Sequence, residues 1–194
     1  MRIVSEISAH EMARRFAIGE VTSQFFASGD HRYREETLAF LASGDKGLEL
    51  EGIRRHHKTR GSFVKSIPPS TRWHIARLEL SMDEFQRLNT IRDTGWIDLT
   101  NSTLKLVDVA QLMEKDPGRD PRLAEVITAC KRGRLELRGI TLFGQTEEGS
   151  LTIVEGTARL VALYLACVLR KASPHCAQNV EVVLGISDTT WRWS

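Results

Sequence analysis

The stretch from Leu151 to Ala166 constrains the fold most, because it joins a buried strand directly to a buried helix. It reads LTIVEGTARLVALYLA. The β-branched run LTIVE, bounded by turn residues, predicts a strand, and the following TARLVALYLACVLRK is apolar on almost every side, which predicts a helix covered by other elements. Further strands are predicted in LRGITLFG and NVEVVLGI. Strands that alternate with helices in this way are typical of an α/β (α+β) fold.

Residues 1–70 predict a mostly helical N-terminal segment that precedes an α/β domain over residues 71–194. Ser8 begins the S-x-x-E pattern of a capping box before MARRF, and Asp30 is placed to cap a second helix. Residues 44–62 read GDKGLELEGIRRHHKTRGS, and these glycines and basic residues interrupt the apolar periodicity, so we expect a loop. The two prolines of SIPPS then indicate a linker or a sharp turn between the two parts.

Helix-capping signals organise the middle of the chain. WHIARLEL predicts a strand, and Ser81 repeats the capping box and opens a helix through EFQRLNTI. Trp96 is expected near a short extended piece, and TLKLVDVAQLMEKD reads as a strand followed by a helix. Asp120 at the N-cap and Pro121 at the first helical position start a helix that Gly133 ends.

Composition excludes several classes of protein. The net charge is +2, with 27 basic and 25 acidic residues, so no global field draws the chain to nucleic acid or to a membrane surface. Cys130, Cys167 and Cys176 are too few and too irregular for a disulfide framework or a CxxC metal site. The N-terminal residues lack the apolar core of a signal peptide, and no run reaches bilayer-spanning length. We therefore expect a cytoplasmic protein with no membrane partner.

The joint between strand and helix carries the strongest indication of a site. Gly156 permits a turn that other residues resist, and the free amides and dipole at the start of the next helix favour an anion. Thr157 can cap that helix or offer its hydroxyl to a ligand. The Arg159 guanidinium suits a phosphate or a carboxylate. Glu155 can orient such a ligand or its metal, or it can pair with Arg159 and simply hold the joint together.

The segment from Leu123 to Leu165 resembles the ParB/sulfiredoxin-like domain. In that family a helix ends near a glycine, two strands follow, and a G-x-x-R loop then opens a second helix. The link from Gly133 to Ile140 is longer than usual, and the resemblance covers the C-terminal half of the chain. The matching positions are Ile127 and Gly133, Ile140 to Phe143, Ile153 to Glu155, Gly156-Thr157-Ala158-Arg159, Leu160 and Ala162.

The resemblance implies a loop that binds nucleotide phosphates, with a nucleotide and Mg²⁺ as the candidate cofactors. Gly156 and Arg159 match the loop, and the two positions between them do not. Sulfiredoxin-type loops have Cys where this chain has Thr157, and a threonine hydroxyl cannot replace a thiolate, so sulfinic-acid reduction is not expected. ParB-type loops have Glu there and Arg where this chain has Ala158. Catalytic residues therefore stay unassigned, and binding of a small phosphorylated ligand is the first hypothesis.

Two other classes of function stay open from the sequence. One is a protein-interaction module that has a vestigial pocket and uses the N-terminal helices as its contact surface. The other is a DNA-binding or nuclease-like protein, for which the basic run from Arg54 to Arg60 is a weak signal. His56, His57 and His74 lack the spacing of metal ligands, so no metal site is assigned. The oligomeric state stays open too.

Overall fold

A six-stranded mixed sheet forms the centre of the computed structural model, which describes residues 1–23, 30–172 and 179–194, without the side chains of residues 56–63. Its strands are β1 (Arg2–Ile7), β2 (Arg72–Arg77), β3 (Leu88–Asn89), β4 (Thr141–Gly144), β5 (Leu151–Glu155) and β6 (Glu181–Ile186). They lie in the order β1-β2-β6-β4-β5-β3. β4 pairs in parallel with β6 and antiparallel with β5, and β3 is parallel to β5.

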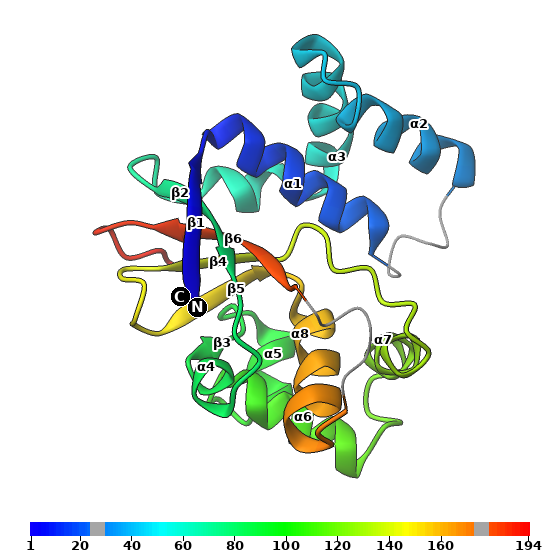
Figure 1. Cartoon of the computed structure of the whole chain (residues 1–194), viewed down its shortest axis with the longest axis vertical. Helices are drawn as coiled ribbons and strands as arrows, with labels where there is room; N and C mark the ends of the chain where they lie inside the picture. Colours follow the sequence, from blue (N-terminus) through cyan, green and yellow to red (C-terminus); the bar gives the residue numbers. More distant parts are fainter. Residues whose placement is uncertain (24–29, 173–178) are drawn as a thin grey trace.

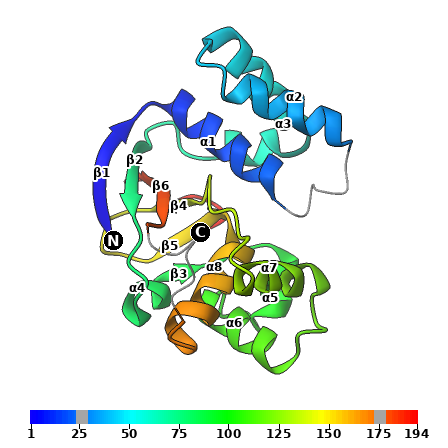
Figure 2. The ribbon, with the colours of Figure 1, turned by 45° about the vertical axis from the view of Figure 1, so that its right-hand side comes forward.

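Helices lie on both sides of this sheet (Figures 1 and 2). On one side are α1 (Ala9–Thr22), α2 (His31–Leu41) and α3 (Lys46–Lys65). On the other are α4 (Met82–Gln86), α5 (Thr94–Leu99), α6 (Leu106–Lys115), α7 (Pro121–Lys131) and α8 (Thr157–Leu163), which continues as the π-helix η2 (Tyr164–Leu169). The expected α/β class is confirmed.

Two cores follow from the alternation of side chains along the strands. In β4, Leu142 packs into the core shared with α6, α7 and α8, whereas Phe143 packs into the core shared with α1. Both residues are almost fully buried. Trp191 from the C-terminal tail lies against Phe143, with the ring centroids 5.5 Å apart, and its indole N–H donates to the Ser66 hydroxyl at 3.0 Å. The tail therefore closes the second core.

Several predicted elements are confirmed with their caps. The Ser8 and Ser81 hydroxyls accept from the amides of the third helical residues of α1 and α4. The carboxylates of Asp30 and Asp120 cap α2 and α7, and Pro121 occupies the first turn of α7. The strand predicted over LTIVE is β5. Each of these signals acts between near neighbours in the chain, which is why the sequence alone reveals them.

The loop expected over residues 44–62 is wrong, because most of that stretch belongs to α3. The Asp45 carboxylate accepts from the amides of Gly47 and Leu48 at 2.8 and 2.9 Å, a capping signal that the glycines obscured. Gly52 does not break the helix. A Cβ there would lie 2.9 Å from Cγ of Leu41, so the missing side chain lets α2 and α3 approach closely.

Three further details differ from what the sequence indicated. Residues 2–7 form the edge strand β1, paired antiparallel with β2, so the N-terminal segment is not purely helical. Trp96 lies in α5, whose first turn the Asp93 carboxylate caps, rather than in an extended piece. The helix predicted from Ser81 also ends early, because residues 88–89 pair with β5 as β3. The division into parts at residue 70 stays a prediction.

Candidate functional site

The turn after β5 requires a glycine for two reasons. Gly156 has φ 100° and ψ 16°, a left-handed conformation that L side chains rarely adopt. In addition, a Cβ on Gly156 would lie 2.9 Å from Cγ1 of the fully buried Ile140. This turn lets α8 begin immediately after the strand, so the first helical amides lie at the end of β5.

Arg159 pairs with Glu155, which is one of the two roles that the sequence left open. Its Nη2 donates to Glu155 Oε1 at 2.6 Å, and its Nη1 donates to the carbonyl of Arg138. Arg159 is only 6% exposed. The pair therefore connects β5 and α8, and the bond to Arg138 adds the segment before β4, so two of the five guanidinium N–H groups are used inside the protein.

Thr157 occupies the first position of α8 without capping it. The N-cap is Gly156, and no side chain caps this end of the helix. The first amides of a helix have no partner within it, so those of α8 stay available. Thr157 is 9% exposed, and within the described part of the chain its hydroxyl has no hydrogen-bond partner. The hydroxyl oxygen is not fully buried, so it is open to the cleft and available to a ligand.

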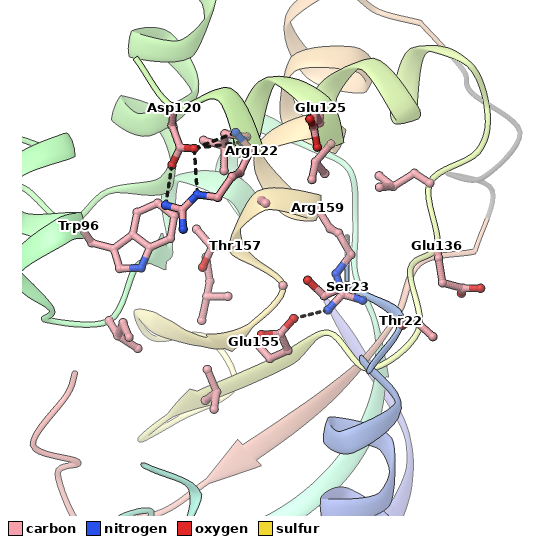
Figure 3. A pocket seen from close by; sticks show the side chains of 18 of the residues that line it. Thr22, Ser23, Trp96, Asp120, Arg122, Glu125, Glu136, Glu155, Thr157 and Arg159 are labelled. Atoms are coloured by element: carbon pink, nitrogen blue, oxygen red, sulfur yellow. Dashed lines mark hydrogen bonds and ion pairs between the residues drawn. The ribbon is translucent and has the colours of Figure 1, made fainter. Parts of the chain in front are cut away.

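A cleft of about 750 Å³ opens beside this turn, and all four predicted site residues line it (Figure 3). In this view Thr157 lies between Trp96 on one side and the Glu155–Arg159 pair on the other. The end of α1 contributes Thr22 and Ser23 to the wall. The cleft is therefore built from both helical layers and from the end of β5, and its volume is typical of small-molecule sites.

The N-termini of three helices meet at this cleft. Those of α5 and α7 are filled by the protein's own carboxylates, because Asp93 accepts from the Gly95 amide at 3.0 Å and Asp120 accepts from the Arg122 amide at 3.0 Å. The start of α8 has no such carboxylate. Of these three helix ends, that of α8 is the one without a carboxylate of the protein, so its first amides are the best placed to meet an anion.

Charged side chains of both signs line the remaining wall. Arg34 and Arg134 have no ion-pair partner within the described ranges, so their guanidinium groups are available to a ligand. Glu136 stays ionised: burial raises the pKa of its carboxyl, but hydrogen bonds from Arg138 outweigh that effect, and the net result is a lowered pKa. The cleft therefore combines an uncapped helix end with fixed charges of both signs.

Comparison with family models, with curated proteins and with solved structures found no match. The resemblance to the ParB/sulfiredoxin-like domain therefore rests on the sequence motif alone and stays a prediction. The cleft has to be interpreted from its own geometry.

The other candidates from the sequence whose side chains the structure describes do not line the cleft. The side chains of His56 and His57 lie outside the described residues, as does Cys176. Cys130 is buried and its thiol donates to the Ala162 carbonyl, and Cys167 is partly buried. Throughout the described ranges, no three or more His, Cys, Asp or Glu side chains cluster as metal ligands would. None of the helices described is long and apolar enough to cross a membrane.

Several residues of the cleft could not be assigned from the sequence. Asp93 and Asp120 have recognisable capping patterns, but a cap does not indicate which helix ends will meet. Arg34 and Arg134 come from segments that lie far from the Gly156 turn in the sequence. Trp96 is expected near an extended piece but lies in the helix α5. The missing information is the tertiary arrangement that brings these segments to one place.

Proposed function

We propose that this protein binds a small phosphorylated ligand in the cleft beside the Gly156 turn. The observation that supports the proposal most is the Thr157 hydroxyl, which is open to the cleft, has no partner among the described residues and lies at the uncapped start of α8. A phosphate oxygen at that point would accept from the hydroxyl and from the first helical amides together. Hydrogen bonds to a charged group are stronger than those to a neutral one.

The charged residues divide the remaining roles. Arg34 and Arg134 would neutralise the phosphate from the cleft wall. Arg159 would support the site indirectly. Its guanidinium is paired with Glu155, and this ion pair would hold the shape of the turn instead of binding the ligand. This supporting role differs from the expectation that the Arg159 guanidinium itself binds the phosphate. A nucleotide with Mg²⁺ stays within the proposal, with the metal carried by the phosphates of the ligand.

The substitution Thr157→Val tests the proposal with two readouts, stability without ligand and affinity for a ligand. Without ligand, the variant should be about as stable as the wild type, because the hydroxyl that it replaces makes no hydrogen bond within the described residues. Its affinity for phosphate compounds should fall roughly 10–100-fold, which corresponds to the 1.5–3 kcal/mol of a hydrogen bond to a charged group. Isothermal titration calorimetry with inorganic phosphate, pyrophosphate and nucleotides measures the second quantity.

Thr128→Val is the matched control. Thr128 is exposed on α7 and lies outside the cleft lining, and its hydroxyl donates to the Ala124 carbonyl. We expect unchanged affinity in that variant. If no phosphate compound binds the wild type, or if Thr157→Val binds as tightly as the wild type, the proposal is wrong. Light scattering and pull-downs would then test the protein-interaction alternative.

A further inference from the structure

We infer that the ligand of this cleft carries a single phosphate group joined to a flat, largely apolar group, and that di- and triphosphates are disfavoured. The inference rests on the proposed function and goes beyond it by naming the class of ligand. It depends on two observations, the charge balance of the lining and the apolar wall formed by α5 and α7.

The charge balance limits how much negative charge the cleft can accept. Among the described residues of its lining there are five carboxylates and four guanidinium groups, and two helix N-termini are already occupied by Asp93 and Asp120. One helix end, that of α8, is left for one anionic group. Arg34 and Arg134 can offset the two charges of one phosphate group. Each further phosphate would add negative charge beside the carboxylates Glu125 and Glu136, whose repulsion opposes it.

The other part of the lining is apolar and incompletely covered. No residue of α5 is fully buried, although its sequence TGWIDL contains three apolar side chains. Two of them, Trp96 and Leu99, line the cleft together with Leu123 and Val126 of α7. Thr157 lies beside this apolar part (Figure 3). A phosphate held at Thr157 would thus direct the rest of the ligand toward Trp96, whose ring is suited to stack on a flat group.

The charge part is tested by titrating adenosine mono-, di- and triphosphate into the full-length protein in EDTA, so that no divalent cation offsets the phosphate charge. The monophosphate should bind most tightly, and the triphosphate roughly fivefold or more weakly, as expected for one added repulsive contact. Glu125→Gln should reduce this difference in affinity between the mono- and triphosphate, because it removes the negative charge of an exposed residue of the lining. Glu148→Gln, exposed and outside the lining, should leave it unchanged.

The apolar part is tested by comparing adenosine monophosphate with inorganic phosphate. The ester should bind at least about tenfold more tightly, as expected when a stacked base adds at least 1.4 kcal/mol. Trp96→Leu should remove most of that advantage without changing the affinity for inorganic phosphate. Tyr33→Leu, at an exposed aromatic residue outside the cleft lining, serves as the control.

The outcomes separate this inference from the proposed function. Triphosphate binding that equals or exceeds monophosphate binding overturns the inference alone, as does an ester that binds no better than inorganic phosphate. The inference is also overturned if Trp96→Leu still binds adenosine monophosphate about tenfold more tightly than inorganic phosphate. If neither phosphate nor any ester binds, the proposed function fails and the inference fails with it.

Discussion

Replacing Gly156 by alanine should be among the most damaging single-methyl additions in this protein. The backbone at Gly156 has φ 100°, and a left-handed conformation costs an L residue roughly 1–2 kcal/mol. The new Cβ would also lie 2.9 Å from Cγ1 of Ile140, and overpacking of this kind costs typically about 1–3 kcal/mol. We therefore expect Gly156→Ala to lower the free energy of unfolding by about 2–5 kcal/mol. Urea denaturation followed by far-ultraviolet circular dichroism measures this loss.

Gly133→Ala separates the two contributions. Gly133 also has a left-handed conformation, with φ 67°, but its Cβ would have nothing within 4 Å. This variant should lose only the conformational cost, about 1–2 kcal/mol. The difference between the two variants then reports the contact with Ile140. Equal losses in Gly156→Ala and Gly133→Ala would refute the argument from close packing.

A double-mutant cycle tests the same contact directly. Ile140→Ala should cost about 2–5 kcal/mol by itself, because Ile140 is fully buried. Combined with Gly156→Ala, it removes the atom that the new methyl group would meet. The double variant should therefore be more stable than the sum of the single losses predicts, by about 1 kcal/mol or more. Additivity within about 0.5 kcal/mol would show that the two positions do not interact.

Two further predictions concern ion pairs. Glu155→Leu should destabilise the protein by about 3–5 kcal/mol, because it removes the carboxylate that pairs with the buried Arg159 guanidinium. Arg159→Met should cost less, because Glu155 is only partly buried, and the double variant should lose less than Glu155→Leu alone. Chemical denaturation measures these losses, and a double variant with the summed loss would contradict the argument. The hydrogen bond from Arg14 lowers the pKa of Glu11, so its stabilisation is full above the pKa of the unfolded chain, about 4.3, and is lost as the pH falls through the lower pKa of the folded chain. Glu11→Gln should flatten that part of the stability profile by at most about 1 kcal/mol, because solvent screens the pair. If the stability of Glu11→Gln falls as steeply at low pH as that of the wild type, the assignment to Glu11 is wrong.

The sequence by itself determined the elements whose signals are local. The β-branched run of β5, the caps of α1, α2, α4 and α7, and the need for a glycine at position 156 all depend on residues a few positions apart. The possible pairing of Glu155 with Arg159 was visible for the same reason, since one helical turn separates them. Such interactions act between near neighbours, and they are present in the chain before any long-range contact forms.

The tertiary structure decided what surrounds the turn. Asp93, Asp120 and Thr157 come from three distant segments, and only the packing of α5, α7 and α8 on the sheet brings their helix ends to one cleft. The second partner of Arg159, the carbonyl of Arg138, is likewise supplied by a different segment. A cleft is the space left between packed elements. Its shape and its charge balance therefore depend on contacts that no local pattern in the sequence encodes.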